Sequence, residues 1–350
     1  MSEEGVPIMI NKSFRGDLHI DFRNSEISLG GGSAQKVTIP IGLPNRNFTP
    51  IQLGILEMIV ESPDNKIDWK VKVNGINVTK EFKPMFTAEV DSTRLFKFVF
   101  DITSILNVDE SMGKNWVNIT LKHEGGSPFL IKNIMLLTIY ESEDGVVELN
   151  YRSGLARIKP GEKIKIKDAD ARSFSNIKII YGSSSKEVTP VLLVGEKPIR
   201  LSLHNSFEEY DLTANEKESI YLAVEDGAKG LKSRYVLLSS VISYISVMKT
   251  PVLEATIENV KIDHEKIELE FTLKNTGESS PDSLVYTVLH KGQTIYVEKE
   301  TKTLPPGSEL HKRILLKSPE ALNQFVLRIV WRKLTKTWFQ DLNITASRFQ

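Results

Sequence analysis

The chain has 350 residues, with 45 lysines and arginines balancing 45 aspartates and glutamates, and no cysteine. This length allows two or three domains of about 100–150 residues, each large enough to bury its own core. The lack of cysteine excludes a disulfide framework, a thiolate zinc site and a cysteine nucleophile, and the neutral balance excludes a global field attracting nucleic acid or anionic membrane.

The first residues, 1–7, lack the basic start and the long apolar stretch of a secretion signal, which predicts a mature or cytosolic chain. The glycine run at 29–33 predicts a loop between strands, because it lacks the spacing of a phosphate-binding loop and no helix follows it. The most apolar window, 235–248, is interrupted by four serines. We therefore expect a soluble protein with no membrane span.

Strict alternation of apolar and polar residues recurs along the chain. Trp69, Val71 and Val73 share one parity, and the Asn74-Gly75 pair that follows supplies the positive φ angles of a two-residue hairpin turn. The same period recurs at 164–167, 267–273 and 325–331, whereas helical periodicity is confined to a few short turns. The sequence predicts an all-β protein.

Two stretches about a hundred residues apart nearly repeat each other. Phe100-Asp-Ile-Thr leads through an alternating strand at 116–121 to the apolar run 134–137, and Tyr210-Asp-Leu-Thr leads through 219–224 to 235–238. Tandem repetition of one β unit is more typical of architecture and surface display than of a single reaction centre.

Turn signals place the boundaries between predicted domains. Glu141–Gly145 closes a first unit, and Lys249-Thr250-Pro251 interrupts the strand pattern after the second. We predict three domains, at 1–145, 146–249 and 250–350. The second could also form one body with the first.

Three strings in the first domain carry a resemblance. Trp69-Lys-Val-Lys-Val-Asn-Gly, then Phe98-Val-Phe-Asp-Ile-Thr-Ser-Ile-Leu106 and Asn115-Trp-Val-Asn-Ile-Thr-Leu121 resemble the galactose-binding-like jelly roll, an accessory domain of many glycoside hydrolases. The likeness spans about residues 65–140 and returns more faintly at 190–240, where Val194 replaces the turn asparagine. The resemblance implies tandem jelly-roll β-sandwiches.

A second resemblance lies at about 255–345. The strand Ile267–Leu273 runs into Lys274-Asn-Thr-Gly-Glu, and Leu304-Pro-Pro-Gly-Ser-Glu forces a later turn. This pattern is similar to immunoglobulin-like modules of the CARDB type, common in surface and adhesion proteins. It implies a C-terminal immunoglobulin-like sandwich, and neither family has one function.

A search for reactive groups predicts no catalytic residue, metal ligand or cofactor. The six histidines have no spacing that places two imidazoles on one metal, and a Gly-X-Ser-X-Gly elbow is absent. Carboxylates at Asp168 and Asp170, or at Asp263 and Glu265, are too closely spaced for the roughly 5–9 Å across a glycosidic bond. A looser calcium site at Asp168 stays open.

The tryptophans are the candidates for stacking on a sugar ring. Trp69 and Trp331 share the parity of their apolar neighbours and are predicted to lie in cores. Trp116 has the opposite parity to its apolar neighbours and Trp338 lies outside the cleanest alternation, and we predict these two as ligand-binding residues.

A basic cluster near two of the tryptophans could serve single-stranded nucleic acid. Because acidic residues balance the chain overall, we interpret it as a solvated strand face and do not expect nucleic acid as a partner. The cluster comprises Arg328, Arg332, Lys333 and Lys336.

Five Asn-X-Ser/Thr triplets would carry glycans if the chain were exported. Chance explains several of them in a chain of this composition. The triplets favour export, whereas the missing secretion signal favours the cytoplasm, so the compartment stays open between the cytoplasm and an extracellular or virion surface. The triplets begin at Asn11, Asn47, Asn77, Asn118 and Asn343.

Three functional hypotheses follow. The first is a non-enzymatic structural or interaction scaffold, part of a surface, adhesion or virion assembly, which binds other proteins or itself through sandwich faces and edge strands. The second is recognition of a glycan by domain one. The third is hydrolysis of a glycoside or an ester.

Overall fold

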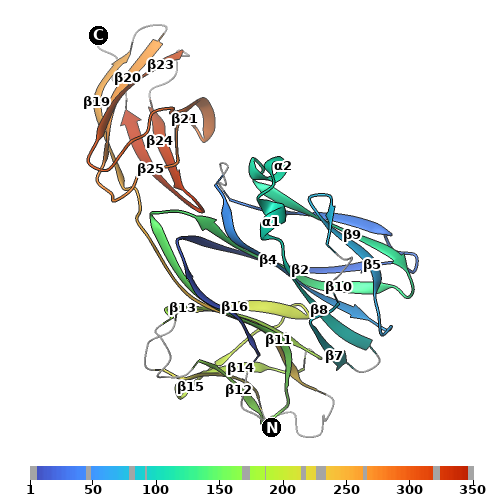
Figure 1. The fold of residues 1–350 in the computed structure, drawn as a ribbon. Helices are drawn as coiled ribbons and strands as arrows, with labels where there is room; N and C mark the ends of the chain where they lie inside the picture. Colours follow the sequence, from blue (N-terminus) through green and yellow to red (C-terminus); the bar gives the residue numbers. More distant parts are fainter. Residues whose placement is uncertain are drawn as a thin grey trace. The chain divides into compact units, whose positions relative to one another are not determined.

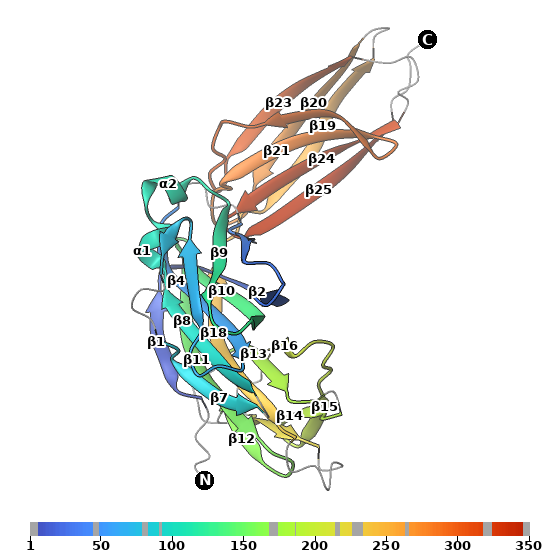
Figure 2. The ribbon, with the colours of Figure 1, turned by 90° about the vertical axis from the view of Figure 1, so that its right-hand side faces the viewer.

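The computed structural model describes residues 6–44, 49–78, 83–90, 93–167, 174–185, 187–213, 218–225, 234–262, 266–317 and 324–345. Its contacts divide the chain into two compact units, Met1–Val247 and Met248–Gln350, here called unit 1 and unit 2. In the described residues, antiparallel strands build both units, and two single-turn helices lie in unit 1 (Figures 1 and 2). The predicted all-β class is confirmed. No helix of the described ranges is long and apolar enough to cross a membrane.

The first sandwich of unit 1 has one five-stranded and one four-stranded sheet, in the orders β2-β10-β4-β8-β7 and β3-β9-β5-β6. Its elements are β2 (Gly16–Leu29), β3 (Lys36–Gly42), β4 (Ile51–Ser62), β5 (Asp68–Val73), β6 (Ile76–Asn77), β7 (Phe86–Val90), β8 (Thr93–Asp101), α1 (Thr103–Leu106), α2 (Asp109–Met112), β9 (Trp116–Gly125) and β10 (Phe129–Glu141).

The second sandwich has the orders β1-β11-β18-β13-β16 and β12-β17-β14-β15. Its elements are β1 (Ile8–Phe14), β11 (Gly145–Ile158), β12 (Lys163–Lys167), β13 (Asn176–Ser183), β14 (Pro190–Val194), β15 (Lys197–Arg200), β16 (Phe207–Thr213), β17 (Ile220–Val224) and β18 (Val236–Met248).

The two sandwiches share one topology. When β7 and β1 are set aside and each sandwich is numbered from one to eight, the strands of both fall in the orders 1-8-3-6 and 2-7-4-5, which is the jelly-roll arrangement. The repeated sequence stretches fall on equivalent strands, because β8, β9 and β10 of the first correspond to β16, β17 and β18 of the second. The tandem repeat is therefore a repeat of structure.

The five-stranded sheets of the two jelly rolls pack face to face. One apolar cluster joins residues of both sheets, among them Ile55 and Ile59 of β4, Leu137 of β10, Tyr151 of β11 and Ile242 of β18. In an isolated jelly roll this face of β4 and β10 would meet water. Its burial explains why unit 1 contains both sandwiches.

The domain boundaries that we predicted stay a prediction. Within unit 1, β1 pairs antiparallel with β11, so the N-terminal strand completes a sheet of the second jelly roll.

The turn predicted at Asn74-Gly75 is confirmed. Both residues have positive φ, 47° and 88°, and they connect β5 to β6. The side-chain nitrogen of Asn74, Nδ2, donates to Ser111 Oγ, and its side-chain oxygen, Oδ1, accepts from Asn118 N, both at 2.9 Å. This asparagine therefore ties the hairpin to α2 and β9.

Unit 2 is a seven-stranded sandwich with the immunoglobulin-like orders β19-β20-β23 and β22-β21-β24-β25. Its strands are β19 (Leu253–Ile262), β20 (Lys266–Asn275), β21 (Ser283–His290), β22 (Gln293–Lys299), β23 (Glu309–Lys317), β24 (Gln324–Lys333) and β25 (Lys336–Thr345). Alternate residues of β20 and β24, including Phe271 and Ile329, fill its core.

Asn275 ends β20 as a fully buried side chain that holds two loops. Its amide donates to the carbonyls of Ser279 (2.9 Å) and Leu304 (2.8 Å), and its oxygen accepts from Gly277 N at 3.0 Å. Replacing Asn275 by alanine leaves these buried backbone groups without hydrogen-bond partners. We therefore expect Asn275→Ala to lower the unfolding free energy of unit 2 by about 2–3 kcal/mol. Urea unfolding measures this loss. The exposed Asn343→Ala is the control, and equal effects of the two would contradict the assignment.

Unit 2 also carries a charged cluster beside β21. Lys312 Nζ lies 2.7 Å from Glu298 Oε1 and 3.1 Å from Glu300 Oε2. The hydrogen bond from Lys312 lowers the pKa of Glu298. Burial would raise the pKa of Glu300, but hydrogen bonds from Lys302 N, Lys312 and Thr301 N outweigh it and lower this pKa as well.

We expect these carboxylates to make unit 2 sensitive to acid. In the folded protein the pKa values of Glu298 and Glu300 lie below the ordinary 4.5, so the unfolded chain takes up protons first as the pH falls. The stability that these carboxylates contribute above pH 4.5 is therefore lost progressively below pH 4.5. Thermal unfolding of unit 2 between about pH 6 and pH 3 measures the slope. Lys312→Met should flatten it, whereas an unchanged slope would contradict this role.

Candidate functional site

A charged network lies buried between the two jelly rolls. Lys97 of β8 and Glu57 of β4 are 0% and 1% exposed, and Lys97 Nζ lies 2.8 Å from Glu57 Oε1. Both side chains point out of the first jelly roll toward β11 and β18. They are diagonal neighbours across the β4–β8 ladder, within reach of long side chains.

The second jelly roll supplies the other partners. Lys97 Nζ donates to Ser239 O at 2.6 Å, to Ser239 Oγ at 2.8 Å and to Ser240 Oγ at 2.7 Å, and it lies 3.2 Å from Gly154 O. Glu57 accepts from Tyr151 OH and from Ser240 Oγ, the latter at 2.7 Å. Ser153 Oγ donates to the same carboxylate at 3.2 Å. Hydroxyl and carbonyl groups of the second jelly roll thus form hydrogen bonds with the charged side chains of the first.

A β-bulge allows neighbouring serines to serve one site. Consecutive residues of a regular strand point to opposite faces. The β13–β18 register shifts at this point, where Ile180 faces Ser240 and Tyr181 faces Leu238, so Ser239 is the extra residue. Both hydroxyls therefore reach Lys97.

The electrostatics of the network reflect its burial. Burial lowers the pKa of Lys97 to about 8, with the Glu57 charge and hydrogen bond acting in the opposite direction. Burial and the Glu57 charge raise the pKa of Tyr151. Amine, carboxylate and hydroxyls together can activate a nucleophile, but here the amine and the carboxylate are 0% and 1% exposed. None of its residues lines the two cavities described next.

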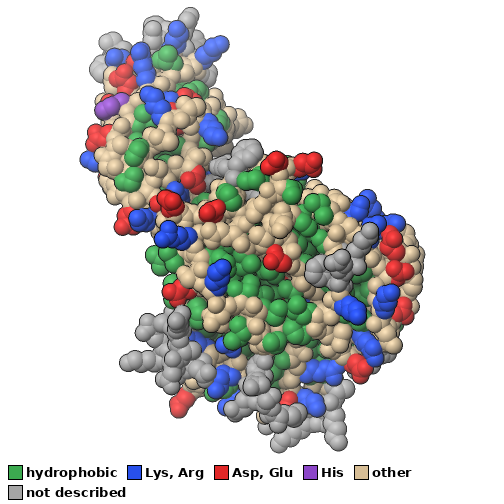
Figure 3. Space-filling model, viewed as in Figure 1, with side chains coloured by type: hydrophobic (Ala, Val, Ile, Leu, Met, Phe, Trp, Pro, Cys, Tyr) green, Lys and Arg blue, Asp and Glu red, His purple; other side chains and the backbone are tan. Residues whose placement is uncertain are grey.

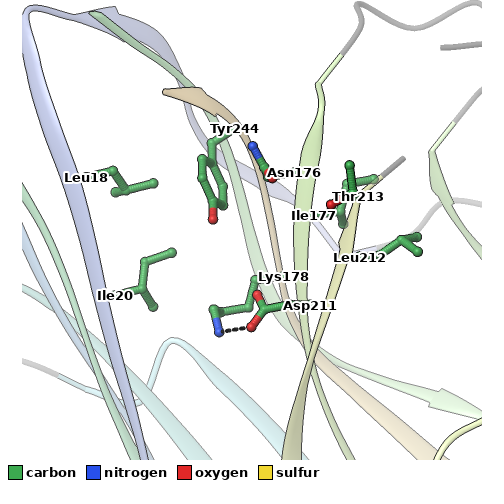
Figure 4. Close-up of a pocket in the computed structure, with 9 residues that line it drawn as sticks. All are labelled: Leu18, Ile20, Asn176, Ile177, Lys178, Asp211, Leu212, Thr213 and Tyr244. Atoms are coloured by element: carbon green, nitrogen blue, oxygen red, sulfur yellow. Dashed lines mark hydrogen bonds and ion pairs between the residues drawn. The ribbon is translucent and has the colours of Figure 1, made fainter. Parts of the chain in front are cut away.

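One cavity of about 270 Å³ opens at the seam between the jelly rolls. Leu18 and Ile20 project from β2 toward Tyr244 and Lys178 (Figure 4). Lys178 Nζ is held by Glu209 Oε2 at 2.7 Å and Asp211 Oδ2 at 2.9 Å. Figure 3 shows hydrophobic side chains gathered over the middle of unit 1 on the face in view.

A larger cavity, of about 580 Å³, also lies between the jelly rolls, and its lining includes Glu26, Lys132 and His204. Its polar groups already bind one another, because Lys132 Nζ lies 3.1 Å from Glu61 Oε2 and Thr93 Oγ1 donates to Glu61 at 2.8 Å. As in the smaller cavity, these charged groups already have partners within the chain.

The outer face of the sheet β3-β9-β5-β6 is the most open candidate. We call it the Trp116 face, since Trp116 lies at the start of β9 and is 49% exposed. Gly42 lies opposite Trp116 on β3, and a side chain there would meet only open space. Val117 and Ile119 point inward to the core. The alternation therefore presents the indole to solvent, as its parity predicted.

The other tryptophans lie against cores. Trp69 packs against Phe98 and Phe129, at ring-centroid distances of 4.8 and 5.6 Å. Trp331 is buried, as predicted, and donates to Pro251 O at 3.1 Å. Trp338 lies opposite Trp331 in the register and packs partly buried against the same core. Ligand binding by Trp338 stays a prediction, with less free ring surface than Trp116 has.

The asparagines of the predicted glycosylation triplets differ in their exposure, and glycosylation stays a prediction. Asn11 and Asn343 are exposed on β1 and β25, and Asn77 and Asn118 are half-buried on β6 and β9. Asn47 lies outside the described residues, as do the carboxylates Asp168, Asp170, Asp263 and Glu265.

The remaining candidates are metal-ligating side chains and the basic cluster at Arg328, Arg332, Lys333 and Lys336. Within the described ranges no three histidine or acidic side chains lie together as metal ligands would. In the basic cluster, Arg328 makes a bidentate pair with Asp341 at 2.7 Å for both contacts, and Lys333 Nζ lies 3.3 Å from Asp282. These partners neutralise much of the cluster.

The Glu57–Lys97 network was not predicted from the sequence. Its signal was one acidic residue in the apolar strand 51–60 and one lysine in the apolar run 95–100, of opposite sign. Charges in strands that are buried on both faces must be paired.

No protein-family model matches this chain. No curated protein matches it in sequence. Three solved structures to which the chain is similar are distant likenesses, with TM-scores too low to support any argument about function.

One is a calcium-binding mutant of Bacteroides uniformis β-glucuronidase 2, with 11% identity, 57% of this chain and 26% of that chain covered, and a TM-score of 0.22. The Ruminococcus gnavus β-glucuronidase in complex with D-glucuronic acid has 10% identity, 90% and 37% coverage, and a TM-score of 0.20. A glycosyl hydrolase family 2 member from Bacteroides cellulosilyticus has 11% identity, 58% and 28% coverage, and a TM-score of 0.23. The chain thus matches only 26% to 37% of these proteins' lengths.

Proposed function

We propose that this chain is a non-enzymatic binding scaffold. The observation that carries the proposal is the buried Glu57–Lys97 network, which joins two jelly rolls face to face while its reactive groups stay sealed from solvent. A sealed ion pair between packed sheets holds outer surfaces at fixed positions and offers no place for a substrate. Partners would then bind at the outward sheet faces and edge strands.

Incubation with chromogenic glycoside and ester substrates, alongside light scattering with candidate protein partners, tests this proposal. A scaffold gives no product and forms complexes or self-associates at fixed stoichiometry. Product formation by the wild type that Glu57→Gln abolishes would overturn it. A strictly monomeric chain that binds no partner would overturn it as well.

A second function, recognition of a carbohydrate by the first jelly roll, is favoured by the exposed Trp116. An indole on an open sheet face can stack on the apolar face of a pyranose, and Asn118 two residues on points to the same side. A glycan array with wild type and Trp116→Ala tests it, with the exposed Phe339→Ala of unit 2 as the matched control. Silence across the array would refute this function and leave the scaffold.

A further inference from the structure

Three lysines face one another across the Trp116 face. Lys36 of β3 is the register partner of Lys122 of β9, which is also the partner of Lys70 of β5. Like charges directly opposite on neighbouring strands destabilise a sheet. The row therefore concentrates positive charge on this face, which suits a negatively charged partner outside the chain.

The acidic groups on this face do not balance the row. Lys122 Nζ pairs with Glu124 Oε1 at 2.6 Å, and this hydrogen bond, together with the charge of Lys70, lowers the pKa of Glu124. Asp68 lies at the same end of β5, opposite Gly125. Both acids lie beyond the lysine row, on the side away from Trp116, so the surface between the row and the indole has no acidic side chain on the described strands of this sheet.

That surface carries the neutral polar side chains of Thr38, Thr120 and Asn118, together with one further lysine, Lys72. In the row next to the lysines, Thr38 Oγ1 and Thr120 Oγ1 lie 2.9 Å apart, with Lys72 as the next register partner of Thr120. Pro40 and Asn118 form the following row, and Gly42 and Trp116 the last. Lys122 lies six positions after Trp116, a span of about 20 Å along the strand.

We infer that the Trp116 face binds a linear acidic polysaccharide, with one sugar ring on Trp116, hydroxyls along the threonine and asparagine rows, and carboxylate or sulfate groups at the lysine row. This inference rests on the carbohydrate-recognition function proposed above and adds the charge of the ligand. Complementary charge relieves the repulsion among Lys36, Lys70 and Lys122, which a neutral glycan would leave in place.

Single-stranded nucleic acid fits the face less well. Such sites stack successive bases on several aromatic platforms. On the described strands of this sheet, Trp116 is the one aromatic side chain that points outward. The rows of amide and hydroxyl groups suit sugar hydroxyls.

Titration calorimetry of the full chain with oligogalacturonate, sulfated dextran, neutral dextran and oligo-dT tests the inference. We expect one or both acidic glycans to bind, and binding to weaken with added salt. Lys36→Gln and Lys70→Gln should each weaken binding about tenfold. Their melting temperatures should stay equal or rise, because like-charge repulsion is relieved, and this separates lost binding from lost folding. Lys197→Gln, on the corresponding sheet of the second jelly roll, should bind as wild type.

The outcomes are distinguishable. Equal binding of neutral dextran that Lys36→Gln leaves unchanged would overturn the acidic ligand but keep carbohydrate recognition. No binding to any glycan would overturn both. Tighter binding of oligo-dT than of either acidic glycan would replace the inference by nucleic-acid binding.

Discussion

Lys97→Met is expected to lower the unfolding free energy of unit 1 by about 3–5 kcal/mol. The substitution leaves the Glu57 carboxylate at 1% exposure with hydroxyl donors but no counter-charge. The double variant Glu57→Gln with Lys97→Met removes both charges and should be more stable than Lys97→Met alone. Denaturant unfolding of the single and double variants gives the coupling energy between the two residues.

Lys132→Met is the matched control for this experiment. Lys132 also pairs with a glutamate, Glu61, but its side chain is 13% exposed and that of Glu61 is 26% exposed, so water can reach the partner that remains. We expect a cost of about 1 kcal/mol or less. If Lys97→Met cost no more than Lys132→Met, the network would not be what joins the jelly rolls.

Phe271→Ala is expected to destabilise unit 2 alone, by about 3–5 kcal/mol. Phe271 is fully buried, and its ring meets that of Tyr286 edge to face at a centroid distance of 5.4 Å. Calorimetry of the full chain should show the transition of unit 2 moving to lower temperature and that of unit 1 staying in place. Phe100→Ala, in the core of the first jelly roll, should do the reverse. A common shift of both transitions would contradict the division into two units.

Much of the fold was readable from the sequence. Alternation gave the strands and the inward parity of Trp69 and Trp331, and the repeated Phe-Asp-Ile-Thr and Tyr-Asp-Leu-Thr strings marked equivalent strands, β8 and β16. Parity works because strand side chains alternate strictly between two faces. It also placed Trp116 outside.

The packing of one jelly roll on the other was harder to read. The runs 55–60 and 134–140 are almost continuously apolar, which is typical of strands buried on both faces, but the pattern does not say what covers the second face. The contribution of Ser239 and Ser240 depends on a bulge, and a bulge leaves little trace in the local sequence. The contact of Trp338 with the core was not predicted, because this residue lies outside the cleanest alternation, and its register with Trp331 is set by the hairpin between β24 and β25.

The two copies of the repeated motif have similar sequences, but their polar side chains make different contacts. Asp101 Oδ1 accepts from Thr103 N, and Thr103 Oγ1 accepts from Gly54 N, so the first copy turns the chain into α1. In the second copy Asp211 instead pairs with Lys178 in the lining of the smaller cavity. The strand position is retained while the polar role changes.

Native-state hydrogen exchange tests most directly whether the two jelly rolls form one body. We expect the slowly exchanging amides of β4 and β18 to open with the same free energy, and Lys97→Met to lower both by the same amount. Separate opening free energies for β4 and β18, with only one of them responding to Lys97→Met, would contradict this expectation.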